Sequence, residues 1–282
     1  MNTRRPPAIA RPTSRRANRR GDDIRKGAPL IVIAALLLAG LIGAYGFVAS
    51  NRVDLNSETG CPTSGPSAIT AILFDRTDPI SEKQKLYLKN KLDGFRERTQ
   101  KFEEVDTYSL EDQGNDVVRP LLRICDLGKG TDVGLLTGNP KLLRERWGKQ
   151  FDAPLRDMLE NRLQGGGAKT SAIFEAIQSV SLQSFQKAKL AAEAPRRLII
   201  ISDLIQFTKT LDFYKEDLNY QNFQQTNEAR RLHTNLNGVS VEILFIPRAR
   251  PDRIDRLVRF WTKWFVDQGA QKDGFKISWV EG

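Results

Sequence analysis

The chain of 282 residues contains a single histidine and only two cysteines. Zinc sites are built from several cysteine or histidine ligands, so this composition argues against zinc. A serine or cysteine hydrolase would depend on His233 as its base, and the chain has no Gly-x-Ser-x-Gly turn to carry a nucleophile. The Gly-x-x-x-x-Gly-Lys spacing of a phosphate-binding loop is also missing, which argues against nucleotide hydrolysis.

Positive charge is concentrated at the N-terminus. The formal net charge is +10, but nine of the 44 basic residues lie in the first 26 positions beside two acidic ones. The remaining chain is nearly neutral, so we expect no sequence-specific binding of nucleic acid. Residues 1–28 combine arginines with prolines and little apolar content, which predicts a disordered cytoplasmic head.

An uncharged apolar segment follows this head, from residue 29 to residue 48. About 20 such residues span a bilayer as a helix, and a basic flank stays cytoplasmic. The sequence therefore predicts a single-pass membrane anchor, with residues 49–67 as a linker and residues 68–282 as a periplasmic or extracellular domain. A cleaved signal peptide is the competing interpretation, because Val48, Ala49 and Ser50 form a small-residue site. The long head and the length of the apolar segment favour an uncleaved anchor.

Both cysteines follow the apolar segment. Export places Cys61 and Cys125 in an oxidising compartment, where an even pair predicts one disulfide. Such a bridge would tie the linker to the sheet. The alternative is two unpaired thiols, one of them buried.

From residue 68 onward, apolar runs alternate with helical spacing. This alternation predicts an α/β fold: a mainly parallel, twisted sheet with helices on both faces, Rossmann-like in class. We expect strands at residues 68–75, 105–110, 121–125, 197–202, 239–246 and 275–280. We expect helices at residues 81–102, with Ser81 as cap, 141–163, with a break at Pro154, 170–194, 227–236 and 251–268.

Two of the predicted strands end in carboxylates. Residues 69–74 run into Asp75, and residues 198–201 run into Ser202 and Asp203. Ligands of open α/β sheets gather at the carboxyl ends of strands. Between the two strands, a run of three glycines leads to a threonine at the start of a predicted helix. Carboxylates and hydroxyls suit Mg²⁺, so we predict a cation site with these ligands: Asp75, Thr77, Thr170 and Asp203.

The order of these motifs resembles the von Willebrand factor type A domain with its metal-ion-dependent adhesion site, over residues 68–282. Asp75 and Thr77 match the first and third places of that family's Asp-x-Ser-x-Ser motif. Thr170 matches its middle threonine, and Asp203 matches its late aspartate. The fifth place is Pro79, which has no hydroxyl. The resemblance implies Mg²⁺, Mn²⁺ or Ca²⁺, bound together with an acidic residue of a partner protein. Possible additional ligands are Asp78, Ser81 and Ser202.

Two segments near the C-terminus carry many aromatic residues. The irregular polar segment of residues 206–226 lies just beyond Asp203, where long loops often carry recognition. The helix at residues 251–268 has one broad apolar stripe, which predicts packing against the sheet.

Three functions remain open. The first, which we favour, is a membrane-anchored interaction module that is not an enzyme. The second is a metal-dependent phosphoester hydrolase, because the residues from Asp75 to Asp78 superficially resemble the nucleophile loop of haloacid-dehalogenase phosphatases. That family requires Asp-x-Asp, whereas Thr77 occupies the third position here. The third is a scaffold whose metal site is degenerate at Pro79.

Overall fold

A computed structural model describes residues 16–50, 53–110, 117–131, 139–163, 167, 169–187, 190 and 193–282. The chain divides into two compact units, Met1–Val53 and Asp54–Gly282.

The described residues of the first unit form one long helix, α1 (Arg16–Ser50). Within it, the 19 residues Pro29–Phe47 are long and apolar enough to cross a membrane, and their side chains are exposed. The chain thus has one N-terminal apolar helix, of the kind found in membrane anchors and in signal sequences. Residues 16–28, which we expected to be disordered, are helical instead. Extending an existing helix fixes the backbone of only one residue for each hydrogen bond that forms. The helix of the apolar segment can therefore continue into the basic residues that precede it.

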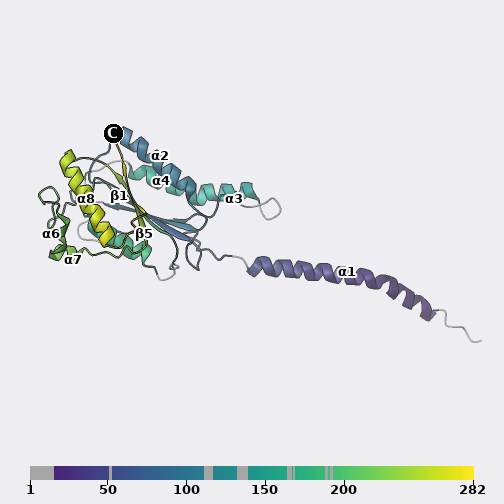
Figure 1. Cartoon of the computed structure of the whole chain (residues 1–282). Coiled ribbons are helices and arrows are strands. Elements are labelled where there is room, and N and C mark those ends of the chain that lie inside the picture. Colours follow the sequence, from purple (N-terminus) through teal and green to yellow (C-terminus); the bar gives the residue numbers. More distant parts are fainter. Residues whose placement is uncertain are drawn as a thin grey trace, which may run out of the picture. The chain divides into compact units, whose positions relative to one another are not determined.

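The second unit is built on a mostly parallel sheet (Figure 1), which confirms the predicted α/β class. Within the described residues the sheet has six strands in the order β3-β2-β1-β4-β5-β6, and only β3 is antiparallel to its neighbour. The strands are β1 (Ala68–Asp75), β2 (Glu103–Leu110), β3 (Leu122–Cys125), β4 (Arg196–Ser202), β5 (Val239–Phe245) and β6 (Phe275–Trp279). Strands β1 and β4 are central neighbours, so their carboxyl ends meet at one edge.

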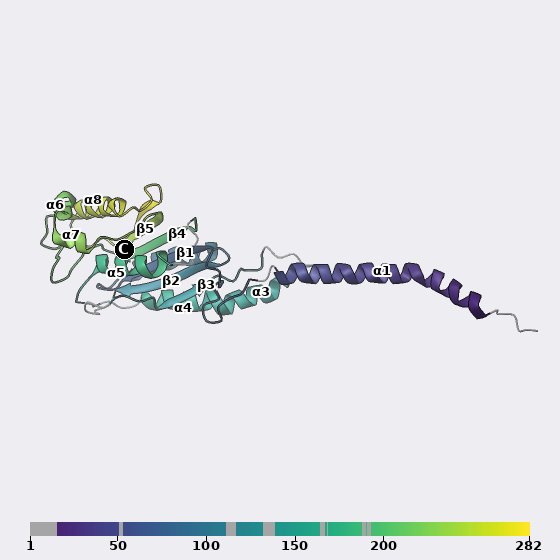
Figure 2. The same cartoon turned by 90° about the horizontal axis from the view of Figure 1, so that it is seen from below.

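Helices cover both faces of this sheet (Figure 2). One face packs against α2 (Glu82–Arg98), α3 (Pro140–Trp147), the π-helical turn Gly148–Asp152 and α4 (Ala153–Arg162). The other packs against α5 (Ile173–Val180), the π-helical turn Ser181–Phe185, α6 (Tyr220–Gln224), α7 (Asn227–Arg231) and α8 (Pro251–Asp267). The predicted apolar stripe of α8 is buried, with Trp261 and Phe265 fully inaccessible, so its packing role is confirmed.

Four predicted helices differ from those observed, and the one expected at residues 81–102 ends at Arg98. The one expected at residues 141–163 is interrupted by the π-helical turn just before Pro154, close to the predicted break. The one expected at residues 170–194 begins only at Ile173 and ends at Phe185. Its start is delayed because Ser171 pairs through its backbone with Phe207 and is therefore extended. The helix expected at residues 227–236, α7, ends at Arg231, so the exposed His233 lies beyond it in an irregular segment.

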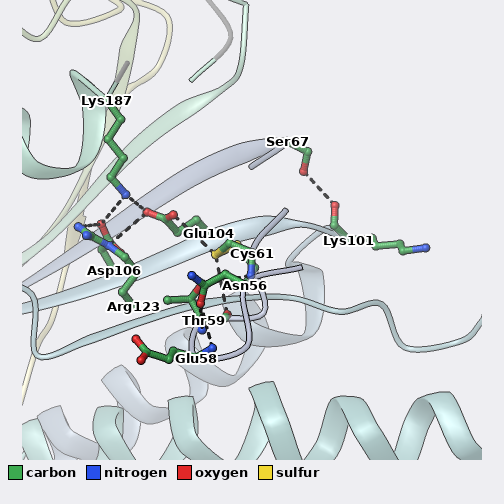
Figure 3. The surroundings of a disulfide bond; sticks show 11 residues. Asn56, Glu58, Thr59, Cys61, Ser67, Lys101, Glu104, Asp106, Arg123 and Lys187 are labelled. Atoms are coloured by element: carbon green, nitrogen blue, oxygen red, sulfur yellow. Dashed lines mark hydrogen bonds and ion pairs between the residues drawn. A yellow bond between two sulfur atoms is a disulfide. The ribbon is translucent and has the colours of Figure 1, made fainter. Parts of the chain in front are cut away.

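Cys61 and Cys125 are joined by a disulfide (Figure 3). The bridge ties the segment before β1 to the end of β3, as the pairing predicted from the sequence requires. Next to it lies a network of charged residues whose two carboxylates, Glu104 and Asp106, are buried. Arg123 donates two hydrogen bonds to Asp106, at 2.8 and 3.0 Å, and Lys187 pairs with Glu104.

Candidate metal centre at the carboxyl ends of β1 and β4

Asp75 is the last residue of β1, and hydroxyl groups surround its carboxylate. Thr77 donates to Oδ1 through both its backbone N–H, at 3.1 Å, and its Oγ1, at 2.8 Å. Two serines donate to Oδ2, Ser202 at 2.7 Å and Ser171 at 3.2 Å. Burial raises the pKa of Asp75, and the hydrogen bonds from Ser202, Thr77 and Ser171 oppose that rise. These donors come from three separate segments, so the fold assembles the cluster.

Asp203 immediately follows β4 and is 5% exposed. Its Oδ1 accepts a hydrogen bond from the backbone of Ile205 at 2.9 Å, whereas its Oδ2 is buried without a hydrogen-bond partner among the described residues. Burial, together with the charge of Asp75, raises the pKa of Asp203 to about 7. An unpaired buried carboxylate is costly unless a positive charge compensates it.

The backbone after Asp203 is held in an unusual conformation. Leu204 has φ 61°, in the left-handed region that non-glycine residues rarely occupy. Two contacts maintain it: the backbone N–H of Leu204 donates to Ser202 Oγ at 2.8 Å, and Trp261 Nε1 donates to the Leu204 carbonyl at 2.8 Å. Trp261 thus does more than pack against the sheet, because it also fixes the loop that carries Asp203.

The loop before α5 contributes Ser171, which the sequence did not single out. Thr170, the predicted ligand, is its half-buried neighbour. Ser171 reaches Asp75 because two backbone hydrogen bonds of 2.8 Å pair it with Phe207. Of the predicted glycine triplet, residue 167 is described, and its N–H donates to the carbonyls of Arg76 and Thr77. Residues 165 and 166 lie outside the described residues.

The remaining candidates lie around this cluster. Ser81 caps α2, where its Oγ accepts a hydrogen bond from Gln84 at 3.2 Å, as the sequence predicted for a cap. Pro79 is exposed, and its carbonyl accepts a hydrogen bond from Arg248. The Nε of Arg248 also lies 3.9 Å from Asp78 Oδ2 and 4.0 Å from Asp203 Oδ2. The positive charge of Arg248 therefore partly offsets the negative charges of Asp78 and Asp203.

This donor set fits a hard divalent cation. It consists of carboxylate and hydroxyl oxygens, which Mg²⁺ prefers. Among the described residues, no hydrogen-bond donor occupies the buried Oδ2 of Asp203, so this oxygen is available to a cation. The structure brings Asp75, Thr77 and Ser202 into direct contact, with Asp203 close enough to interact electrostatically with Asp75.

Comparisons with known proteins give structural matches only: no family model and no curated protein sequence matches the chain. A von Willebrand factor type A structure from Catenulispora acidiphila has a TM-score of 0.43 at 10% identity, over 77% of this chain and 39% of that one. The open conformation of the pilus adhesin SpaC from Lactobacillus rhamnosus GG has a TM-score of 0.45 at 10% identity, over 78% of this chain and 29% of that one. The conserved hypothetical protein BatB from Bacteroides thetaiotaomicron has a TM-score of 0.37 at 10% identity, over 74% of this chain and 89% of that one.

This chain thus spans well under half the length of the first two structures. Within the described residues, the α/β unit has a mostly parallel six-stranded sheet with helices on both faces, the class of fold that the sequence predicted.

Proposed function

We propose that the α/β unit is a protein-interaction module that captures an acidic residue of a partner through a divalent cation, Mg²⁺ or a similar ion. The observation that carries this proposal is the buried Oδ2 of Asp203, which has no hydrogen-bond partner among the described residues and lies near the carboxylate of Asp75. Two neighbouring carboxylates repel each other in a low-dielectric site, and a bound cation relieves that repulsion.

Asp75, Thr77 and Asp203 would hold the ion, together with hydroxyls from Ser202 and the segment of Thr170. When bound, the cation supplies a coordination position that a carboxylate of a partner can fill. The hydrogen bonds from Ser202 and Ser171 orient Asp75 and oppose the rise of its pKa, which favours cation binding over protonation.

The single histidine of the chain lies away from the candidate site. The only histidine, His233, precedes β5, whereas the candidate site follows β1 and β4. Because these strands are parallel, His233 belongs to the opposite edge of the sheet. The site therefore gains no general base from it.

The apolar helix within α1 would anchor the module in a membrane. Its basic flank supports a cytoplasmic N-terminus, which would place the α/β unit in the periplasm or outside the cell. The disulfide is in keeping with such a compartment.

The test uses the full chain in lipid nanodiscs and three isosteric variants. Asp75→Asn and Asp203→Asn should each abolish Mg²⁺ binding measured by titration calorimetry, with circular dichroism unchanged. Asp273→Asn, an exposed acidic residue outside the site, serves as the matched control and should bind Mg²⁺ normally.

Partner capture is tested in parallel, by crosslinking in membranes with and without EDTA. A captured protein that is indifferent to EDTA and to both site variants would refute the metal-dependent mechanism. Hydrolysis of p-nitrophenyl phosphate that disappears in Asp75→Asn would replace the proposal with the hydrolase function.

A further inference from the structure

Two exposed aromatic residues lie beside the candidate metal centre. Phe207 is 38% exposed and Tyr214 is 56% exposed, and their rings meet edge to face with centroids 5.7 Å apart. Exposed aromatic pairs are uncommon on surfaces that only face water, whereas aromatic residues are enriched in binding surfaces. We call Phe207 and Tyr214 the aromatic pair.

The backbone holds the aromatic pair in place. Phe207 exchanges two backbone hydrogen bonds of 2.8 Å with Ser171, whose hydroxyl contacts Asp75. Phe207 also forms a bridge with Asp212, which returns the chain toward Tyr214. Phe207 is thus one strand spacing, about 5 Å, from a residue that touches the site.

The segment that carries the pair is rooted in the core. Gln206 and Phe213, which directly precede Phe207 and Tyr214, are 0% and 1% exposed. The ring of Phe213 packs against Phe260 of α8, with centroids 4.9 Å apart. The two aromatic rings are therefore exposed because a tightly packed segment presents them outward.

The ring of Tyr214 contacts Phe207, whose backbone pairs with Ser171 beside Asp75. Burial raises the pKa of its phenol, and the charges of Asp203, Asp78 and Asp75 raise it further. Its phenol therefore lies within electrostatic reach of the same carboxylates that would hold the cation.

The rim around these residues carries positive charge. Lys169 precedes Thr170 and Lys209 follows Phe207 by two positions; both are exposed, as is Arg248, whose Nε lies 3.9 Å from the half-exposed Asp78. A partner segment that approaches the aromatic pair therefore meets cations before it reaches the buried carboxylates, which favours an acidic segment.

We propose that the aromatic pair is the specificity-determining half of the partner-binding surface. It binds an apolar side chain of an extended protein segment, within about three positions of the acidic residue at the cation, since an extended chain rises about 3.4 Å per residue. The partner is thus a segment in which an acidic residue and a large apolar residue are close neighbours. This inference rests on the proposed function and adds the second recognition element to it.

The probe is a displayed peptide library with a fixed central aspartate and random flanking residues. The full chain in nanodiscs captures peptides in Mg²⁺, and EDTA elutes them. Wild type should enrich Leu, Phe, Trp and Ile near the aspartate at least about tenfold. The variant with Phe207→Ser and Tyr214→Ser should lose this enrichment while it binds Mg²⁺ as wild type does. Leu182→Ser removes a comparably exposed apolar side chain, 59% exposed, outside the site and should leave the enrichment intact.

The outcomes separate this inference from the proposed function. If the peptides eluted from wild type carry polar residues beside the aspartate, the aromatic pair has no role in specificity. The same holds if the apolar enrichment survives in the double variant. Either result leaves the proposed function standing. An empty EDTA eluate from wild type overturns both.

Discussion

Ser202 donates a hydrogen bond of 2.7 Å to Asp75, and so joins two strand ends that are 127 residues apart in the chain. The same Ser202 oxygen accepts the backbone N–H of Leu204, which directly follows Asp203. One hydroxyl thus contacts both the carboxylate of Asp75 and the backbone that directly follows Asp203.

Replacing Ser202 by alanine should weaken cation binding. Loss of this hydrogen bond leaves the buried Oδ2 of Asp75 one donor short, so protonation competes better with the cation. We expect Mg²⁺ affinity at pH 7 to fall about tenfold, equivalent to roughly 1.4 kcal/mol, as measured by calorimetry. Ser67→Ala removes a hydroxyl before the start of β1 and should leave affinity unchanged. An unchanged affinity in Ser202→Ala would contradict the role of this contact.

The stability of the metal-free protein should depend on pH through Asp203. Its pKa is about 7 in the folded protein, above its ordinary value of 3.8, because of burial and the charge of Asp75. Between these values the folded state binds more protons than the unfolded state, so the free energy of unfolding falls as pH rises through this window. The fall is at most about 4 kcal/mol.

Urea unfolding in EDTA between pH 4.5 and 8.5 measures this dependence. Asp203→Asn should flatten it, and Mg²⁺ should restore the stability of wild type at pH 8. An identical pH profile in wild type and Asp203→Asn would show that Asp203 is compensated by other means.

Replacing Trp261 of α8 by phenylalanine should disturb the candidate site, because Trp261 holds the loop that follows Asp203. The substitution keeps an aromatic ring but removes the donor to the Leu204 carbonyl, which leaves a buried acceptor unpaired at a cost of about 1–3 kcal/mol. We expect lower stability together with weaker Mg²⁺ binding. Trp264→Phe, at an equally buried position of α8, should lower stability through lost packing but leave Mg²⁺ affinity near that of wild type.

Removing the disulfide should destabilise the α/β unit without changing the site. Cys61 and Cys125 are 64 positions apart, a loop whose closure is worth about 4 kcal/mol in the chain-entropy model. The variant with Cys61→Ser and Cys125→Ser should therefore unfold at a lower urea concentration. A reducing agent should shift wild type to the same midpoint and leave the variant unaffected. A wild-type midpoint that is insensitive to reductant would indicate that the bridge contributes little.

The sequence was most informative where a pattern is local. The apolar run before Asp75 and the run before Ser202 predicted two buried strands, and the structure contains both as central neighbours. The cap at Ser81 was also predictable, because a capping box depends only on residues three positions apart. The delayed start of α5 was not, because it follows from pairing with Phe207, 36 positions away from Ser171.

The sequence by itself determined the class of fold and the apolar N-terminal helix, and it supplied the oxygen-bearing side chains that we propose as ligands at the candidate centre. Periodicity, length and residue chemistry are properties of short segments, so they can be read without the fold. Only the tertiary structure decided which hydroxyls reach Asp75, that Oδ2 of Asp203 is left without a hydrogen-bond partner among the described residues, and that Phe207 and Tyr214 flank the centre. These relationships depend on strand order and loop packing, which bring distant residues together.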